Sequence, residues 1–341
     1  TISGVLLGFV LGGSVAVGKQ LLRHCVTGAY PKPCIAEMGG KNACIVTEHA
    51  DLDAAASGIV RSAFGLGGQK CSALSRLYVH EQVADALIWH PDVRRMLLTG
   101  KAYAEGARAF TSYVALQIDR ELHHPDADVR KEAADEVALL TPVIKAFITD
   151  NAWIATSDAM QVFGGHGYIS EWGMEQYVRD ARINMIYEGT NTIQSLDLLG
   201  RKILGDNGAK LRKFGEKIKA FVEDNGTDEA MSEFVTPLGD LGDKVTKLTM
   251  EIGMKAFQNP DEVGAACVPY LRVVGHMIYS YLFAQMAKIA LEKESSGDTF
   301  YTAKLATARF YFARLQPETA TLIRQARSGS ANLMALDADL F

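Results

Sequence analysis

The sequence predicts a mainly α protein, built of antiparallel helical bundles that are preceded by a short α/β fragment. Its composition is that of an ordinary globular protein, with 48% hydrophobic and 22% charged residues, and its 341 residues allow about two domains. Residues 89–341 repeat apolar side chains at helical spacing, whereas residues 1–88 contain short β-rich runs and paired glycines. We therefore expect the boundary near residue 88.

The first 88 residues have the sequence pattern of short strands separated by turns. Residues 43–46 and 76–79 are short β-rich runs, and glycine pairs at 12–13, 39–40 and 67–68 mark turns. This part of the chain therefore predicts an α/β fragment.

Helical patterns begin just after this fragment. One helix is expected from about residue 92 to residue 122, because the residue before Pro125 is biased away from helical backbone. Thr141 and Pro142 have the chemistry of an N-cap followed by proline in the first turn, and Gly164 marks the end of that helix.

The rest of the chain predicts an antiparallel bundle. A helix should open after Thr190 and run to about residue 204, and two more should cover about 261–293 and 299–326. Apolar residues that alternate steps of four and three form a bundle seam at Phe234, Leu238, Leu241, Val245, Leu248 and Ile252.

Charge and cysteine content exclude several functions. The 35 Lys and Arg residues against 40 Asp and Glu give a net charge of −5 with no basic stripe, so nucleic-acid binding is not expected. Five scattered cysteines predict neither a disulfide framework nor a metal site. The apolar stretch 5–17 is too short to span a membrane and lacks the basic residues of a signal peptide. We expect a cytoplasmic protein with a small-molecule substrate.

Two glycine-flanked loops in the first fragment each present a reactive side chain. Residues 37–42 read Glu-Met-Gly-Gly-Lys-Asn, and residues 68–73 read Gly-Gln-Lys-Cys-Ser-Ala. A cysteine thiolate can attack a carbonyl, and a nearby carboxylate can activate the water that releases the acyl group. A single cysteine is, however, more often a small buried hydrophobe.

These loops resemble those of the aldehyde dehydrogenases, most closely the branch that oxidises the glutamate semialdehyde derived from proline. Cys71 follows Glu37 by 34 residues, the separation that this family uses. The resemblance implies that Cys71 is the nucleophile, that its backbone N–H lines the oxyanion hole, and that Glu37 is the general base of deacylation. It also implies NAD or NADP as the cofactor.

Two further motifs lie in the helical part. Residues 161–168 contain a Gly-Gly-x-Gly turn, whose backbone N–H groups could approach a pyrophosphate closely, although such a turn is more often just a helix end. Residues 186–191 place Glu188 directly before a Gly-Thr helix start. Its carboxylate is either a site residue at a loop tip or a capping acid.

Together these motifs resemble the third domain of the acyl-CoA dehydrogenases, and the resemblance covers residues 89–341. Glu188 follows Gln161 by 27 residues, the interval that this family uses. The resemblance implies dehydrogenation of an acyl-CoA thioester, with Glu188 removing the α-proton while the β-hydrogen leaves as hydride to FAD. It implies FAD contacts at Gln161, Gly164, Gly165, Gly167, Thr190 and Thr192.

These resemblances predict three segments: an aldehyde dehydrogenase-like α/β fragment (1–88), an acyl-CoA dehydrogenase-like helical domain (89–205) and a C-terminal helical extension (206–341). A homo-oligomer is expected because the family's glycine turn serves a neighbouring subunit's flavin, and an electron-accepting flavoprotein is an expected partner.

Two alternatives to acyl-CoA dehydrogenase activity stay open. Activity could belong to Cys71 and Glu37 as an NAD(P)-dependent aldehyde dehydrogenase, or the chain could be composite, or a helical association module without activity of its own.

Overall fold

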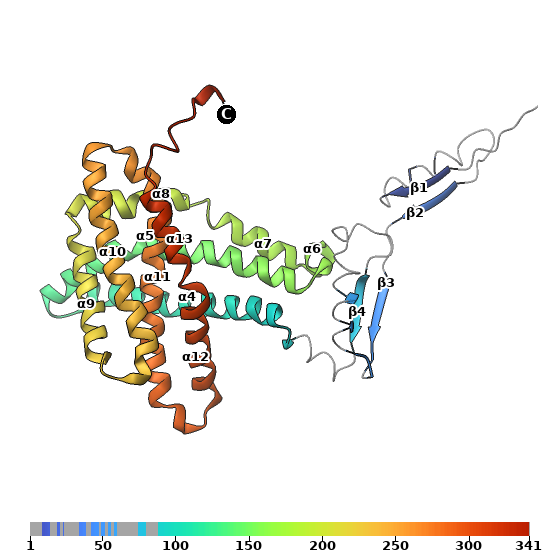
Figure 1. Cartoon of the computed structure of the whole chain (residues 1–341), viewed down its shortest axis with the longest axis horizontal. Coiled ribbons are helices and arrows are strands. Elements are labelled where there is room, and N and C mark those ends of the chain that lie inside the picture. Colours follow the sequence, from blue (N-terminus) through green and yellow to red (C-terminus); the bar gives the residue numbers. More distant parts are fainter. Residues whose placement is uncertain are drawn as a thin grey trace, which may run out of the picture. The chain divides into compact units, whose positions relative to one another are not determined.

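The computed structural model describes residues 88–340 without a gap, together with four strands and a few short pieces of residues 1–87 (Figure 1). The chain divides into two compact units. One comprises Thr1–Arg95 and Ala159–Glu175, and the other comprises Met96–Asp158 and Gln176–Phe341.

The described strands of the first unit form two parallel pairs. Strand β1 (Phe9–Gly13) pairs with β2 (Cys34–Met38), and β3 (Asn42–Val46) pairs with β4 (Leu74–Val79). Neighbouring side chains of β3 alternate in exposure: Val46 is buried and Ile45 is exposed, as expected where successive side chains point to opposite faces. The described strands β3 and β4 confirm the β-rich runs expected at residues 43–46 and 76–79.

The remainder of the described chain is helical. Its α-helices are α4 (Pro91–His123), α5 (Ala127–Val162), α6 (Gly165–Tyr168), α7 (Met174–Ile183), α8 (Asn191–Leu196), α9 (Ala209–Asn225), α10 (Ser232–Gln258), α11 (Asp261–Glu292), α12 (Thr299–Phe310) and α13 (Glu318–Arg327). Two π-helical segments are η3 (Asp197–Ile203) and η7 (Tyr311–Leu315). Short 3₁₀ turns are η2 (Ser170–Trp172), η4 (Leu204–Asp206), η5 (Glu229–Met231), η6 (Glu294–Ser296) and η8 (Ala338–Leu340).

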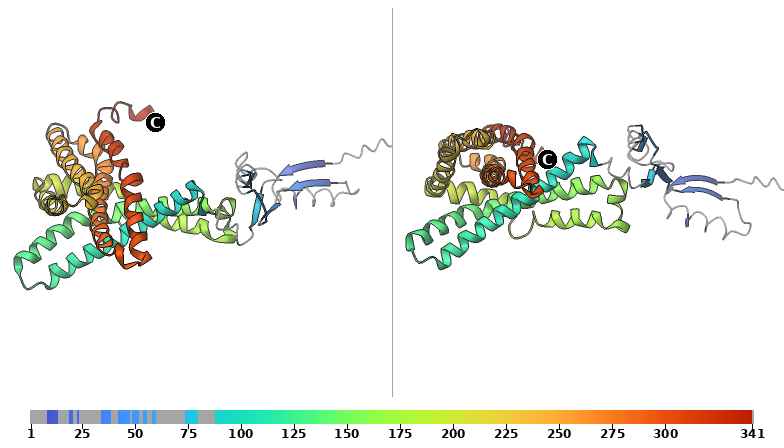
Figure 2. Two further views of the ribbon diagram at one scale, coloured as in Figure 1. Left: turned by 60° about the horizontal axis from the view of Figure 1, so that its bottom comes forward. Right: turned by 90° about the horizontal axis from the view of Figure 1, so that it is seen from below.

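Helix α11 forms the centre of the second unit. Apolar side chains surround it on all sides, which is the pattern of a buried helix, and it contacts α8, α10, α12 and α13 within the bundle (Figure 2). Two glycines allow its neighbours to approach. The Tyr279 ring of α11 fills the space beside Gly106 of α4, and the Phe147 ring of α5 fills the space beside Gly275 of α11.

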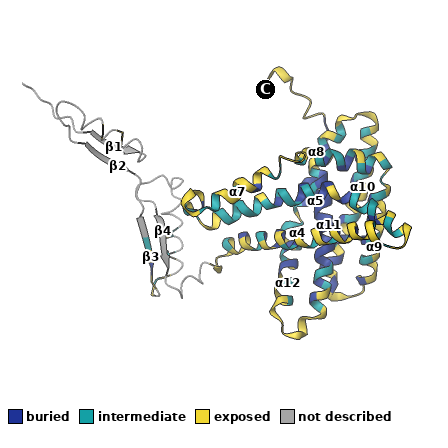
Figure 3. Ribbon diagram, turned by 180° about the vertical axis from the view of Figure 1, so that it is seen from behind, coloured by how far each residue is buried: buried dark blue, intermediate teal, exposed yellow. Residues whose placement is uncertain are grey.

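The predicted bundle seam is confirmed. All six of its positions are buried in α10, namely Phe234, Leu238, Leu241, Val245, Leu248 and Ile252, and Figure 3 shows burial concentrated along the helices of this bundle. The helix expected over 299–326 is instead two helices. The π-helical segment η7 and Pro317, which precedes the first residue of α13, separate them.

The expected helix start at Pro142 is wrong. Pro142 is buried inside α5, and the helix continues through it without interruption. The hydroxyl of the preceding Thr141 donates to the Val137 carbonyl at 2.6 Å. Continuation of the helix buries Leu139 and Leu140 before the proline in the same core as Val143 and Phe147 after it, and this packing outweighs the lost backbone hydrogen bond.

Among the helices in the described part of the chain, α5 is long and apolar enough to cross a membrane by length and composition. Its most apolar side chains, Leu140, Val143 and Phe147, are fully buried in the protein core. Packing within the bundle therefore accounts for these side chains, and 39% of the apolar window of α5 is buried.

Candidate functional site

The turn between α7 and α8 carries Glu188 in an unusual backbone conformation. Glu188 has φ of 55° and the following Gly189 has φ of 82°. For a residue with a Cβ, the left-handed region costs roughly 1–2 kcal/mol, and such strain persists only where surrounding contacts enforce it. Glu188 itself is exposed.

A lysine from α5 supplies one of these contacts. Lys145 Nζ donates to the Gly189 carbonyl at 2.7 Å and to Asn191 Oδ1 at 2.8 Å. Partial burial lowers the pKa of Lys145, and the negative charges of Asp150 and Glu188 oppose this shift. The ammonium group thus lies within electrostatic reach of the Glu188 carboxylate.

The Asn191 side chain fixes the end of the turn to the same helix. Its Nδ2 donates to Asp150 Oδ1 at 2.6 Å, to Thr149 Oγ1 at 3.0 Å and to the Ala146 carbonyl at 3.2 Å. Burial raises the pKa of Asp150, although the hydrogen bond from Asn191 and the charge of Arg272 partly offset the rise. The C-terminal end of the turn is therefore anchored to α5 at two neighbouring positions, Gly189 and Asn191.

Helix α8 does not use Glu188 as its cap. The Thr190 side chain accepts a hydrogen bond from the Ile193 backbone N–H at 3.4 Å, which makes Thr190 the N-cap. The backbone carbonyl of Glu188 accepts from Gln194 Nε2 at 3.2 Å. The interpretation of Glu188 as a capping acid is thus removed, and its carboxylate stays available. Thr192 is exposed in the first turn of α8.

The three glycines of the turn at residues 164–167 differ in whether backbone conformation or packing excludes a side chain. Gly164 has φ of 60°, which disfavours a side chain. A Cβ at Gly167 would lie 2.3 Å from the Met160 carbonyl oxygen, so packing requires that glycine. A Cβ at Gly165 would meet nothing within 4 Å. The described chain therefore leaves open space at Gly165.

The remaining predicted residues are placed as follows. Gln161 is exposed in the last turn of α5, in the same compact unit as the glycine turn, whereas Glu188, Thr190 and Thr192 belong to the other unit. Glu37 lies in β2, where it is in register with Gly12 of β1. Cys71 lies outside the described residues.

Comparisons with known proteins identify the two parts of the chain. Residues 60–204 match the family model "Acyl-CoA dehydrogenase, C-terminal domain", and residues 214–337 match "Acetyl-CoA dehydrogenase C-terminal like". Residues 8–95 match "Aldehyde dehydrogenase family". Most of this chain is therefore similar to the C-terminal part of acyl-CoA dehydrogenases.

Individual relatives agree with both assignments. The 3-methylmercaptopropionyl-CoA dehydrogenase of Ruegeria pomeroyi is 36% identical over 234 residues, which cover 67% of this chain and 40% of that protein. The 1-pyrroline-5-carboxylate dehydrogenase of Oceanobacillus iheyensis is 61% identical over 80 residues, which cover 22% of this chain and 16% of that protein. The chain spans 39–43% of the length of four acyl-CoA dehydrogenase relatives.

A solved structure supports the fold. The acyl-CoA dehydrogenase of Bacillus anthracis, crystallised with FAD, superposes with a TM-score of 0.55 at 17% identity over 72% of this chain and 43% of that one. The expected helical fold is confirmed, and so are both family resemblances. Residues 60–95 are matched by both kinds of family model, and the described structure there includes β4 as well as the start of α4.

Three anchoring residues of the acyl-CoA dehydrogenase turn are absent from the sequence predictions. Lys145, Asp150 and Asn191 hold the turn, yet only Asn191 belongs to a recognisable motif, the one at residues 186–191. Lys145 lies 44 residues before Gly189 on another helix, and nothing in its local sequence distinguishes it from a solvent-facing lysine.

Proposed function

We propose that the helical part of this chain serves the α,β-dehydrogenation of acyl-CoA thioesters, with Glu188 as the base that removes the α-proton. The observation that carries the proposal is the backbone at Glu188. Its carboxylate is exposed, it does not cap α8, and a left-handed turn anchored by Lys145 and Asn191 presents it. Proton abstraction requires such a base at a fixed position relative to the substrate.

The residues around the turn have separate roles in this proposal. The Glu188 carboxylate accepts the α-proton, and the backbone N–H of Glu188 polarises the thioester carbonyl, which stabilises the charge that develops as the proton leaves. Lys145 and Asn191 do not meet the substrate. They hold the carbonyl of Gly189 and the start of α8, so that the direction of the carboxylate is set before substrate binds.

The glycine turn and the threonines of α8 fit a flavin. The backbone at Gly165 borders open space, and the Thr190 hydroxyl accepts from its own helix and keeps its proton free to donate. FAD, when bound, supplies the acceptor for the β-hydride. Two separate groups of residues would contact a flavin: Gln161, Gly164, Gly165 and Gly167 in one compact unit, and Thr190 and Thr192 in the other.

The test compares Glu188→Gln with Glu294→Gln, an exposed glutamate in η6, in flavin-loaded preparations of the full chain. Turnover of butyryl-CoA with an artificial electron acceptor and incorporation of deuterium at the α-carbon in D₂O are measured. Loss of both signals in the Glu188 variant only, by a factor of at least about 100, is expected for removal of a catalytic base. Retention of both signals in Glu188→Gln would refute the proposal.

We also infer the wider organisation. The boundaries 1–88, 89–205 and 206–341 separate the aldehyde dehydrogenase fragment, the acyl-CoA dehydrogenase domain and its extension.

Large apolar side chains are exposed around the glycine turn, at Phe163 (55%), Tyr168 (76%) and Trp172 (57%). Such a cluster favours burial against another subunit, which supports a homo-oligomer. Measurement of the native mass in solution tests the homo-oligomer. Separately, we infer that the electrons taken from the substrate pass on to an electron-accepting flavoprotein.

A second candidate activity depends on the 61% identity of an N-terminal stretch to a pyrroline-carboxylate dehydrogenase. In that case the Cys71 thiolate would add to the aldehyde carbonyl to give a thiohemiacetal, whose hydride and proton would have to leave, the hydride to NAD or NADP, before a thioester results. Glu37 would activate the water that hydrolyses this thioester. Formation of NAD(P)H from glutamate semialdehyde, abolished in Cys71→Ser and retained in Glu188→Gln, would support it. Its absence in the unmodified chain would exclude it.

A further inference from the structure

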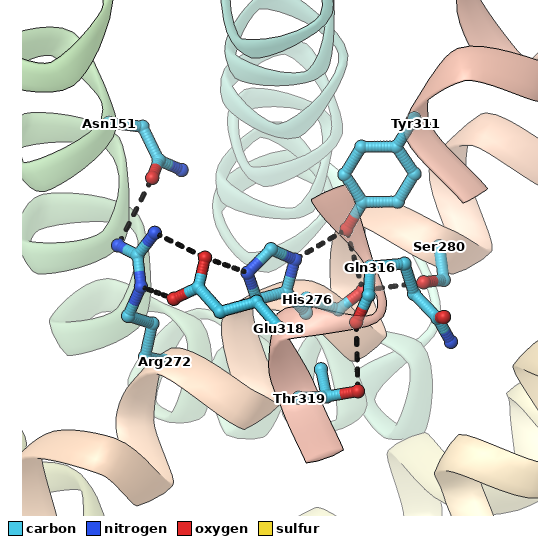
Figure 4. A network of polar contacts seen from close by, with 8 residues as sticks. All are labelled: Asn151, Arg272, His276, Ser280, Tyr311, Gln316, Glu318 and Thr319. Carbon is cyan, nitrogen blue, oxygen red and sulfur yellow. Dashed lines mark hydrogen bonds and ion pairs between the residues drawn. The ribbon is translucent and has the colours of Figure 1, made fainter. Parts of the chain in front are cut away.

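A buried polar network connects three helices of the larger compact unit (Figure 4). Arg272 of α11 donates two hydrogen bonds to the carboxylate of Glu318 in α13, from Nε to Oε1 and from Nη2 to Oε2 at 3.1 Å. Its remaining nitrogen, Nη1, donates to Asn151 Oδ1 of α5 at 3.1 Å. One guanidinium group therefore holds α5, α11 and α13 together.

His276 completes the network on the far side of Glu318. Its Nδ1 lies 2.9 Å from the Tyr311 hydroxyl, and its Nε2 lies 3.6 Å from Glu318 Oε2. Burial lowers the pKa of His276, so the ring is neutral at pH 7. Arg272 is consequently the cation that compensates the Glu318 carboxylate.

The segment of α5 that meets this network also holds the Glu188 turn. Phe147 and Asn151 are one helical turn apart and face α11, where the Phe147 ring lies 5.6 Å from the Arg272 guanidinium carbon. Lys145 and Thr149 are also one turn apart and contact Asn191 of the Glu188 turn. The helical repeat sets these two pairs about 160° apart around the helix axis, on opposite sides of α5.

Electrostatics link the two sides as well. Asp150, which accepts the hydrogen bond from Asn191, lies within reach of the Arg272 charge, and this charge offsets part of the cost of burying the Asp150 carboxylate. Loss of Arg272 would remove an anchor of α5 on one side and a stabilising charge for Asp150 on the other.

We propose that Arg272 is a positioning residue for Glu188: it fixes α5 against α11 and α13, and through Lys145, Asp150 and Asn191 it maintains the strained turn that presents the Glu188 carboxylate. A left-handed glutamate persists only if its anchors are rigid. Those anchors are side chains of α5, so the precision of the turn depends on how firmly α5 is held. The role of Glu188 as the base rests on the proposed function, whereas the coupling itself does not.

The test is hydrogen exchange of the full chain, followed in peptides that cover residues 185–194. The variant is Arg272→Met. The matched control is Arg327→Met, which also breaks a two-point arginine–glutamate pair, to Glu251, but between α13 and α10 and away from α5. Exchange in α9 (Ala209–Asn225) reports loosening of the whole bundle.

The expected result is exchange at residues 185–194 that is at least about tenfold faster in Arg272→Met, with a smaller change in α9 and no local change in Arg327→Met. Equal acceleration in α9 and in the Glu188 turn, or no acceleration at all, would overturn the proposal. If Arg272→Met does not fold, Asn151→Ala removes only the acceptor on α5, and unchanged exchange at 185–194 in that variant is equally decisive against it.

A kinetic measurement separates this proposal from the one on which it rests. In a flavin-loaded chain that turns over butyryl-CoA, Arg272→Met should lower kcat by at least about tenfold with little change in KM, because the base is misplaced while the substrate still binds. Undiminished turnover in Glu188→Gln would refute the role of Glu188 as base, yet the exchange experiment would still decide whether Arg272 holds the turn.

Discussion

The Phe147 ring of α5 fills the space beside the backbone of Gly275 in α11, where an added Cβ would lie 2.4 Å from ring carbons. The ring is fully buried and also meets Tyr279 edge-on, with centroids 4.9 Å apart. It cannot move away without displacing other core side chains. This contact therefore sets how closely α5 and α11 approach, next to the residues that anchor the Glu188 turn.

Gly275→Ala should destabilise the protein by about 2 kcal/mol, because overpacking a rigid core forces helices or side chains to shift. Gly264→Ala on the same helix is the control, since a Cβ there meets nothing within 4 Å. That substitution should be stabilising by up to about 1 kcal/mol through helix propensity. Urea denaturation measures both, and equal effects of the two changes would contradict the packing argument.

A matched pair of substitutions separates structure from flavin binding in the glycine turn. Gly167→Ala should weaken the turn, because its Cβ would overlap the Met160 carbonyl, which is backbone and cannot rotate away. Gly165→Ala should leave stability within about 0.5 kcal/mol of the parent but reduce FAD affinity by at least about tenfold. Thermal unfolding and flavin titration provide the two measurements. Undiminished FAD affinity in Gly165→Ala would remove that residue from the site.

Much of the fold could be predicted from sequence because long helices repeat their pattern many times. The seam from Phe234 to Ile252 spans five turns, so chance alternatives are few. Pro142 misled the prediction because its local chemistry favours a helix start, while only the tertiary burial of residues on both sides reveals a continuous helix.

The site was only partly predictable for a related reason. Glu188 lies within a compact motif, whereas Lys145 contacts the turn from α5 and Arg272 contacts α5 from α11, through contacts that local sequence does not encode. Neither residue has a distinctive sequence neighbourhood. Contacts between distant segments of the chain place them.

Glu188→Gly should relieve the backbone strain at the expense of function. Removing the Cβ recovers roughly 1–2 kcal/mol of left-handed strain, against about 0.5–1 kcal/mol of added chain entropy in the unfolded state. The net expectation is a gain in stability of up to about 1 kcal/mol with loss of acyl-CoA turnover. Denaturant unfolding and the turnover assay test this together, and a clear loss of stability would show that the Glu188 side chain has a structural role.

Acid should weaken the bundle through Glu318. Burial alone would raise the pKa of this carboxyl, but the neighbouring imidazole and the Arg272 guanidinium lower it to about 2. The unfolded chain thus binds a proton at higher pH than the folded chain does. The stability that this carboxylate contributes is present above its ordinary pKa of 4.5 and is lost as the pH falls towards 2.

Glu318→Gln tests this dependence. At pH 7 it should cost about 2 kcal/mol, less than the 3–5 kcal/mol of a fully buried broken pair, because the Glu318 side chain is 36% exposed and solvent screens it. The difference from the parent should narrow between pH 4.5 and pH 2, since the carboxyl of the unfolded parent takes up a proton over that range while the folded one stays charged until about pH 2. Denaturant unfolding at a series of pH values measures it. A difference that stays constant down to pH 2 would mean that the shape of the pair, and not its charge, stabilises the junction of α11 and α13.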